Sequence, residues 1–392
     1  MTAVGRARLS WVLDRRLREG TLEIVLPHGR SLRLSGRSSG PTALLRLNRW
    51  RALPRFFRGG TVGFGESYMD GDWDSPDLPK VIELAARNLP SKPMRYRNLS
   101  PWRIADRLGH RFRPNTRDGS KQNIAAHYDL GNDFYALWLD PSMTYSSAVF
   151  ARGNTDLQTA QAEKNRRLMD LGSIGDGDRV LEIGCGWGGF AIQAARERGA
   201  HVTAITVSRA QFDEAQKRVA AAGLGEKVDI QLRDYRDLVG TWDHAVSVEM
   251  IEAVGEKFWP DYFTRVGSVV RSGGTFALQA IVIENDRFDA YRRSADFIQK
   301  HIFPGGALPS PDVIRAQARA AGLTWKTVYG YGIDYADTLA QWRAGFEAAA
   351  DQAAAMGFDA RFRRCWSFYL AYCEGGFRAG NIDALQVALV KD

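Results

Sequence analysis

Residues 180–190, VLEIGCGWGGF, place the pattern G-x-G-x-x-G at Gly184, Gly186 and Gly189, directly after a short apolar run. Glycines at this spacing permit a tight turn from a strand into a helix and let the backbone approach a ligand closely. Loops that bind nicotinamide dinucleotides have this spacing, and so do loops that bind S-adenosylmethionine. The stretch therefore predicts a strand–loop–helix cofactor site and leaves both cofactors open.

The chain around this loop alternates between helical and strand patterns. Repeated strand–helix–strand units predict a parallel sheet covered by helices on both faces, with ligands bound beyond the carboxyl ends of the strands. We therefore predict an α/β fold built on a doubly wound, Rossmann-like domain. The predicted strands lie near residues 179–184, 201–207, 228–234, 244–250 and 275–283, and the predicted helices near 156–172, 190–199, 208–223 and 257–271.

Acidic residues near the strand ends distinguish the two cofactors. A dinucleotide loop needs an Asp or Glu about 20 residues further on, at the end of the second strand, but residues 203–208 read TAITVS. Class I methyltransferases instead keep an acid just before the glycines and another after the third strand. Glu182 and Asp234 stand at these two positions. The pattern therefore favours S-adenosylmethionine.

Composition limits the class of protein. The 392 residues are 45% hydrophobic and 25% charged, which is ordinary for a globular chain. There is no run of about 18 apolar residues that would predict a membrane-spanning helix. The first 20 residues contain arginines but no apolar signal-peptide core, which predicts a cytoplasmic protein. Cys185, Cys365 and Cys373 are too few and too poorly spaced for a zinc site or a disulfide framework, so no metal is expected.

The positive charge is concentrated in the first third of the chain. Residues 1–120 carry 23 Lys and Arg against 11 Asp and Glu, whereas the remainder carries 30 against 34. This asymmetry indicates an anionic partner, either lipid headgroups or nucleic acid, or else simply an arginine-rich solvated surface. Residues 42–60 interleave apolar and aromatic side chains with five arginines, a pattern that fits a membrane surface or a buried core face equally well.

The sequence divides into three parts. Residues 1–92 begin with a predicted hairpin at 21–36 and continue through the turn-rich stretch 63–78 into a helix, which predicts a small α+β N-terminal domain. Residues 93–118 are basic and contain several prolines, and we expect a linker there. Residues 119–392 then form the predicted methyltransferase domain.

The motifs together resemble the cyclopropane-fatty-acyl-phospholipid synthase family, which includes the mycolic acid methyltransferases. The resemblance covers nearly the whole chain, and residues 63–78 resemble the small N-terminal domain of the bacterial phospholipid synthases. It implies cofactor contacts from residues on several predicted strand ends, with Thr206 and Gln211 filling the place of the missing ribose acid. The motifs are HYDLGNDFYALWLDPSMTYSSAVF (127–150), VLEIGCGWGGF (180–190), VTAITVSRAQ (202–211), LRDYRDL (232–238), SVEMIEAVG (247–255), HIFPGGALP (301–309) and YGIDYADTLAQW (331–342). The candidate cofactor-binding residues are Tyr145, Ser146, Glu182, Gly184, Gly186, Gly188, Thr206, Gln211, Asp234 and Tyr235.

The family's substrate implies the chemistry of the site. An alkene in the middle of a phospholipid acyl chain is a weak nucleophile, so it must be held against the sulfonium methyl in a dry pocket. Methyl transfer leaves a carbocation, which aromatic faces stabilise. A base must then remove a proton: loss from the new methyl closes a cyclopropane ring, and loss from elsewhere leaves a methyl- or methylene-branched chain. The aromatic candidates are Tyr335, Trp342, Phe368 and Tyr372, each with core packing as its alternative role.

In ring-forming members the resemblance implies a bicarbonate base held by a Cys, a Glu, a His and a Tyr. Glu252 and Tyr335 match the Glu and the Tyr, but Ser147 stands at the Cys position and Gln279 at the His position. Ser and Gln still donate hydrogen bonds, so bicarbonate stays open, and the alternative is that Glu252 or a water it orients takes the proton. We therefore expect a branch that methylates without necessarily closing a ring.

Other functions fit the sequence less well. Strict cyclopropane synthesis is the nearest alternative. A nucleic-acid methyltransferase would suit the basic N-terminal third, but the chain has neither an Asn-Pro-Pro-Tyr motif nor a Pro-Cys nucleophile, so no nucleic-acid partner is expected. A non-catalytic membrane module would not need to retain Glu252 and Tyr335. The expected partner is unsaturated phospholipid at the inner face of the membrane, with anionic headgroups favoured, and the resemblance leaves a homodimer open.

Overall fold

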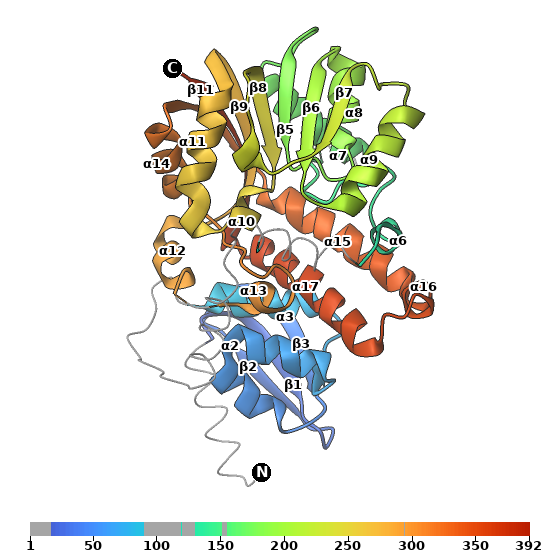
Figure 1. The fold of residues 1–392 in the computed structure, drawn as a ribbon. Coiled ribbons are helices and arrows are strands. Elements are labelled where there is room, and N and C mark those ends of the chain that lie inside the picture. The colour runs from blue at the N-terminus through green and yellow to red at the C-terminus, as the bar shows by residue number, and fades with distance from the viewer. Residues whose placement is uncertain (1–16, 90–118, 120–129, 151–154, 294) are drawn as a thin grey trace.

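The computed structural model describes residues 17–89, 119, 130–150, 155–293 and 295–392. The predicted linker at 93–118 lies outside the described residues. Figure 1 shows a small N-terminal domain below, long helices across the middle and a large sheet above. Among the described residues no helix has both the length and the apolar character needed to cross a membrane.

The N-terminal domain is a four-stranded sheet with two helices. The predicted hairpin is confirmed, because β1 and β2 pair antiparallel with Thr21 opposite Ser35. Residues 63–69, expected to be turn-rich, instead form the second half of α2, which is kinked at Gly60 with φ of 56°. The sheet order is β2-β1-β3-β4. The elements are β1 (Glu19–Val25), β2 (Ser31–Ser35), β3 (Ser38–Leu47), α2 (Ala52–Met69), β4 (Trp73–Asp74) and α3 (Leu78–Asn88).

The sequence pattern of the basic segment 42–60 fitted either a buried core face or an exposed surface, and the structure shows some of both. Its first part belongs to β3, where Leu45 and Leu47 are buried in the domain core. Its second part enters α2, where Phe57 remains 51% exposed. The alternating strand pattern therefore serves the core. In the helix Phe56 packs against Phe64 and Trp73, while Phe57 faces outward.

The large sheet has seven strands in the order β10-β11-β9-β8-β5-β6-β7. The predicted parallel core is confirmed, since β5 pairs parallel with β6 and β8, and β8 pairs parallel with β9. The sheet is not parallel throughout, because β11, which the sequence patterns did not reveal, runs antiparallel to both β9 and β10. The strands are β5 (Arg179–Ile183), β6 (His201–Thr206), β7 (Val228–Leu232), β8 (Trp242–Val248), β9 (Val270–Ile283), β10 (Leu323–Gly330) and β11 (Ile382–Lys391).

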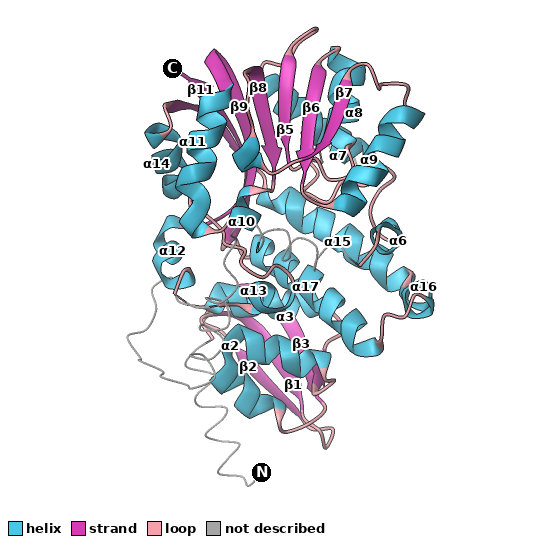
Figure 2. Cartoon of the chain, viewed as in Figure 1, coloured by secondary structure: helices cyan, strands magenta, loops and turns pink. Residues whose placement is uncertain are grey.

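Helices cover both faces of this sheet, as Figure 2 shows. Successive residues of β5 point to opposite faces: Val180 joins the core beneath α7, α8 and α9, and Leu181 joins the core beneath α11 and α14. The sheet is therefore doubly wound, as predicted. The covering helices are α7 (Leu157–Leu171), α8 (Gly189–Arg198), α9 (Arg209–Ala221), α11 (Trp259–Val269) and α14 (Pro311–Ala320). The shorter elements are α6 (Asn132–Ala136), η1 (Tyr235–Asp237), α10 (Ile251–Val254), η2 (Glu256–Phe258), α12 (Asn285–Tyr291) and α13 (Phe297–His301).

Two long helices, α15 (Gly332–Ala348) and α17 (Ala360–Arg378), join the two domains, with the short α16 (Ala350–Ala355) between them. They lie below the carboxyl ends of the parallel strands in Figure 1. On α17, Arg364 donates to the carbonyl oxygens of Tyr68 and Trp73 at 2.7 and 3.1 Å, and its guanidinium lies 3.9 Å from the centre of the Tyr68 ring. Gly375 allows close packing against α3, because a Cβ there would lie 2.7 Å from Ile82. The N-terminal domain is thus firmly attached to α17.

An ion cluster makes a second connection between the domains. Glu66 of α2 contacts Lys300 at 3.0 Å and His301 at 3.1 Å, both on α13. Its hydrogen bond with His301, together with Lys300, lowers the pKa of Glu66 to about 2. A carboxyl whose pKa is lowered by folding stabilises the folded state above its unfolded pKa, and this contribution disappears as the pH falls through the folded pKa.

Glu66→Gln is therefore expected to lower the free energy of unfolding at pH 7 by about 1 kcal/mol, discounted for the partial exposure of the cluster. The difference from wild type should shrink as the pH falls from about 4.5 to about 2, since the wild-type carboxyl then takes up a proton. Urea unfolding at a series of pH values measures this difference. An equal gap at pH 7 and pH 3 would contradict the assignment.

Candidate active site

A cavity of about 1010 Å³ lies at the carboxyl edge of the seven-stranded sheet. Its lining comes from the glycine loop after β5, from residues after β6, β7 and β8, and from α15 and α17. It also continues between the sheet and helices of the N-terminal domain. The cavity therefore connects the predicted cofactor loop with a long, mainly apolar interior.

The glycine loop has the backbone that only glycine adopts readily. Gly184, Gly186 and Gly188 all have positive φ, at 82°, 53° and 83°. A Cβ on Gly186 would meet no atom within 4 Å, and Gly186 lines the cavity, so the loop leaves open space where a ligand can approach its backbone. Gly188 does not line the cavity; it precedes the first turn of α8 as its N-cap residue. Gly188 therefore shapes the turn into α8 and is not part of the cavity wall.

Buried ionisable groups lie beside the loop. Glu182 is 3% exposed at the end of β5 and lines the cavity, and burial raises its pKa. Its Oε2 has no hydrogen-bond partner among the described residues. Lys164 of α7 is also buried, which lowers the pKa of its ammonium, and it donates to the Ser146 hydroxyl at 2.7 Å. A buried carboxyl oxygen without a partner at the cavity wall fits the ammonium end of a bound cofactor, whose positive charge would favour the ionised form of Glu182.

Residues after the next two strands complete this end of the cavity. Thr206 donates to Gln211 at 3.0 Å, and both line the cavity. Asp234 follows β7, accepts from the Arg236 backbone N–H at 2.9 Å, and also lines the cavity. Tyr235 is buried beside it, and its hydroxyl has no partner among the described residues. These groups fit the ribose and adenine ends of S-adenosylmethionine, as the resemblance implies.

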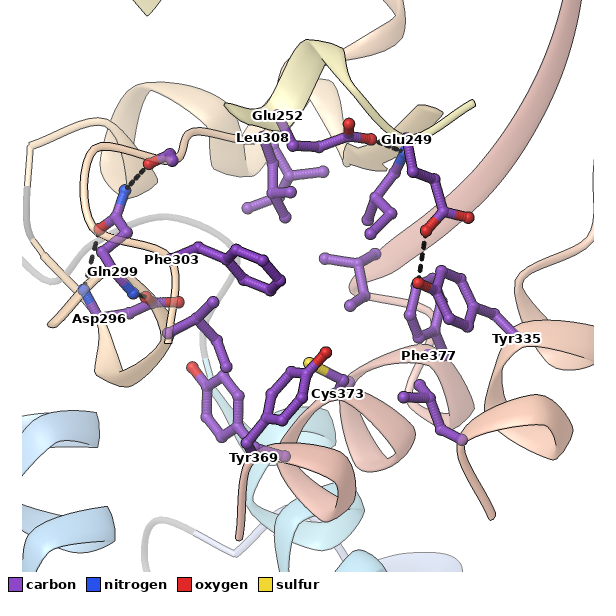
Figure 3. A pocket seen from close by; sticks show the side chains of 18 of the residues that line it. Glu249, Glu252, Asp296, Gln299, Phe303, Leu308, Tyr335, Tyr369, Cys373 and Phe377 are labelled. Carbon is purple, nitrogen blue, oxygen red and sulfur yellow. Dashed lines mark hydrogen bonds between the residues drawn. The ribbon is translucent and has the colours of Figure 1, made fainter. Parts of the chain in front are cut away.

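The other end of the site is organised around Glu249, which sequence reasoning did not single out. Its Oε1 accepts from the Ser147 backbone N–H and from the Gln279 side chain, both at 2.8 Å. Its Oε2 accepts from the Tyr335 hydroxyl at 2.6 Å, as Figure 3 shows. Burial raises the pKa of Glu249, and these three hydrogen bonds oppose the rise. The carboxylate is thus held at the cavity wall by three donors.

Glu249 has an uncommon backbone conformation. Its φ of 49° lies in the left-handed region, which costs a residue with a side chain about 1–2 kcal/mol. Such conformations persist where surrounding contacts hold them, and they concentrate at functional sites. The three donors supply those contacts. Glu249 directly follows the buried strand β8, so an acid at the carboxyl end of a parallel strand was the available sequence signal.

Of the four residues predicted for the catalytic step, three gather around Glu249. Ser147 does so through its backbone, because its hydroxyl donates instead to the Ala148 carbonyl oxygen. Glu252 lies apart from the Glu249 contacts and accepts from the Ile281 backbone N–H. Burial first, and the nearby Glu249 charge second, raise the pKa of Glu252 to about 8. Glu252 is therefore mostly protonated at pH 7.

Aromatic side chains form much of the wall opposite. Tyr335 stacks on Phe377 with ring centres 4.5 Å apart, and Tyr369 donates to or accepts from the Tyr145 hydroxyl at 2.7 Å. Figure 3 shows Phe303, Tyr369 and Phe377 around the open centre of the pocket. Tyr335 and Tyr372 of the predicted aromatic set line the cavity. Trp342 and Phe368 do not, and both are fully buried in the core, so their role is packing.

The doubly wound sheet, the left-handed glycine loop and the acids at its strand ends define a class I S-adenosylmethionine-dependent methyltransferase. Residues 115–387 match the family model described as mycolic acid cyclopropane synthetase. The chain belongs to this family, and its cofactor is S-adenosylmethionine.

Relatives of known name agree with this placement. The chain is 43% identical over 351 residues to a tuberculostearic acid methyltransferase of Mycobacterium tuberculosis, covering 86% of this chain and 81% of that protein. It is 34% identical over 333 residues to the cyclopropane-fatty-acyl-phospholipid synthase of Escherichia coli K12, covering 85% and 84%. The solved mycolic acid cyclopropane synthase CmaA1, complexed with SAH and CTAB, has a TM-score of 0.65 and 30% identity, covering 69% of this chain and 98% of that one.

Proposed function

We propose that the protein transfers a methyl group from S-adenosylmethionine to the cis double bond of an unsaturated acyl chain in membrane phospholipid. The product is a methyl- or methylene-branched chain. The relatives support methylation or cyclopropanation of lipid acyl chains. One observation supports the more specific part of the proposal. Three hydrogen-bond donors fix the Glu249 carboxylate in the wall of the apolar cavity, and the cofactor loop lines the same cavity.

The mechanism follows from this arrangement. S-adenosylmethionine supplies an electrophilic methyl group when bound. On transfer of that methyl group, the alkene's π electrons would form the new carbon–carbon bond in place of the methyl–sulfur bond, and positive charge would remain on the chain. The faces of Tyr335, Tyr369 and Phe377 suit that charge without attacking it. Glu249 then takes a proton from a carbon next to the cation, and the electrons of that carbon–hydrogen bond form a new double bond. The product is a methyl-branched alkene. It is a methylene-branched chain if a hydride first shifts from the methylated carbon to the cation and the new methyl group then loses the proton.

Glu249 is a better base than Glu252 at neutral pH. The pKa of about 8 leaves Glu252 mostly protonated at pH 7, so it has little capacity to accept a further proton. The Glu249 carboxylate receives hydrogen bonds from Tyr335, Gln279 and the Ser147 backbone, all of which favour its charged form. In this proposal the base is therefore Glu249, and not Glu252, which the sequence offered as the alternative to bicarbonate.

A bicarbonate base fits this site poorly. Gln279, Tyr335 and Ser147 were the candidates to hold the anion together with Glu252. The Ser147 hydroxyl donates instead to the Ala148 carbonyl oxygen, and only its backbone N–H points to this site. All three already donate to the Glu249 carboxylate. A second anion beside it would face like-charge repulsion in a buried site. Ring formation, the activity in the name of the Escherichia coli relative, is the competing proposal, with bicarbonate as the base that the resemblance implies.

A phospholipid substrate would require the protein to act at a membrane surface, and we propose this location for it. The basic first third of the chain suits the anionic inner leaflet, since each Lys or Arg near such a surface contributes about 1 kcal/mol. The exposed Phe57 lies on α2 next to Arg58, which is also exposed. This pairing of an aromatic with a cation supports a cytoplasmic protein bound peripherally to the inner face of the membrane.

A methyl-transfer assay on phospholipid vesicles tests the function. Purified protein and S-adenosylmethionine with a labelled methyl group should move the label into vesicles of a cis-monounsaturated phospholipid. Matched vesicles of the saturated phospholipid should remain unlabelled, because they offer no π electrons. Equal labelling of both, or labelling of neither, would overturn the proposal.

A further inference from the structure

The active-site cavity does not end at the reaction centre. It extends into the N-terminal domain, where residues from the sheet and from α3 line it. Six of these are Leu22, Ile24, Leu45, Leu47, Val81 and Leu84. The solved mycolic acid cyclopropane synthase is matched over only 69% of this chain, and the family model begins at residue 115. This part of the cavity is therefore an addition to the methyltransferase domain.

The two parts of the cavity meet along α17. Gly376 and Phe377 of α17 line the cavity, and Phe377 stacks on Tyr335, which holds Glu249. Gly375, next to them, is the point where α17 packs tightly on α3. A chain leaving the reaction centre along α17 therefore passes directly into the N-terminal domain.

The interior of this extension is chemically a hydrocarbon site. The six residues above are aliphatic. Asn88 also lines it, but its side-chain amide is committed to backbone groups: its oxygen accepts from Glu19 at 3.1 Å, and its nitrogen donates to Leu84 at 2.8 Å. A ligand there gains from apolar burial and finds few polar partners.

Two exposed apolar residues mark the outer part of the extension. Phe57 is 51% exposed and Leu89 is 53% exposed, and both also line the cavity. Residues that are both exposed to solvent and in contact with the cavity stand where it meets the surface. Arg58, exposed beside Phe57, supplies positive charge at this point. An apolar rim with a cation suits a lipid surface whose chains enter and whose phosphates stay outside.

We propose that the N-terminal domain is a second hydrocarbon site, which encloses the part of the substrate's acyl chain that lies on one side of the double bond. It receives that chain from the bilayer at Phe57 and Leu89. The inference rests on the proposed function, because it takes the occupant to be the lipid that is methylated. It changes the N-terminal domain from a docking surface alone into part of the substrate site.

Photocrosslinking tests this inference on the full-length wild-type protein. The probe is a vesicle of cis-monounsaturated phosphatidylglycerol carrying a diazirine, in one preparation near the ester and in another near the methyl end. After illumination, peptide mass spectrometry should find adducts from one of the preparations on the segments that contain Leu22, Leu45 or Val81. Leu34 is an internal control, because it is 1% exposed in the same domain but does not line the cavity.

A variant provides a second readout. Leu45→Trp fills the extension, so adducts on these segments should disappear and the KM for long-chain lipid should rise at least tenfold, since each buried methylene contributes about fourfold to affinity. Leu45→Ala leaves the extension open and should retain the adducts. Methyl transfer with adducts only in the catalytic domain would overturn the inference and leave the function intact. Adducts in the N-terminal domain without any methyl transfer would instead overturn the function.

Discussion

Glu249→Gln is expected to slow formation of the methylated lipid by about 10²- to 10⁴-fold, the usual contribution of a positioned general base. Glutamine has the same shape and keeps an acceptor for one of the donors, but it cannot take a proton at neutral pH. The loss should fall on turnover, because Glu249 lies with Tyr335 and Gln279 rather than on the glycine loop. Steady-state methyl-transfer kinetics on monounsaturated vesicles, with calorimetric binding of S-adenosylmethionine, measure both quantities.

Glu252→Gln is the matched control for this change. Glu252 is three residues away and, like Glu249, partly buried, and its hydrogen bond from the Ile281 backbone N–H can be kept by the glutamine oxygen. Because burial already leaves Glu252 mostly protonated at pH 7, removing its charge should slow turnover less than about tenfold. If Glu252→Gln were the slower variant, the base would be Glu252, which the sequence left open as an alternative to bicarbonate.

Gly186→Val is expected to weaken S-adenosylmethionine binding by roughly a hundredfold or more, which is about 2.7 kcal/mol. A Cβ on Gly186 meets no protein atom within 4 Å, and Gly186 lines the cavity. The valine methyls would therefore project into the space that the cofactor fills. Isothermal titration with the cofactor or its demethylated product measures the loss directly.

Gly223→Val separates this effect from backbone strain. Gly223 has φ of 67°, close to the 53° of Gly186, and a Cβ there also meets nothing within 4 Å. It does not line the cavity. Both variants should lose similar stability, since a β-branched residue is strained at positive φ, but only Gly186→Val should lose cofactor affinity. Equal loss of affinity in the two variants would show that strain, and not obstruction, is responsible.

The fold could be predicted largely because its core consists of regular alternating units. The strands and helices from residue 156 to residue 283 have strong periodicity, and short connections fix their order in the sheet. The antiparallel strand β11 returns to the sheet after two long helices, and no local pattern specifies that pairing. The helix over residues 63–69 contains two glycines, which signalled a turn, yet its buried face packs it into the domain core.

The cofactor end of the site could be predicted better than the catalytic end. Glu182 and Thr206 lie at the carboxyl ends of β5 and β6, and Asp234 follows β7, so topology alone brings them to one edge. The Glu249 cluster joins residues 147, 249, 279 and 335, and their meeting depends on the packing of α15 against the sheet. The sequence offered Glu249 and Glu252 within one motif, and their different hydrogen-bond partners distinguish them.

The most direct test of the account is the identity of the lipid product. After the vesicle assay, the acyl chains are converted to methyl esters and separated by gas chromatography with mass detection. The proposed step, in which proton loss to Glu249 leaves a double bond and closes no ring, predicts methyl- or methylene-branched esters without a cyclopropane ester. A cyclopropane ester as the sole product would contradict that prediction.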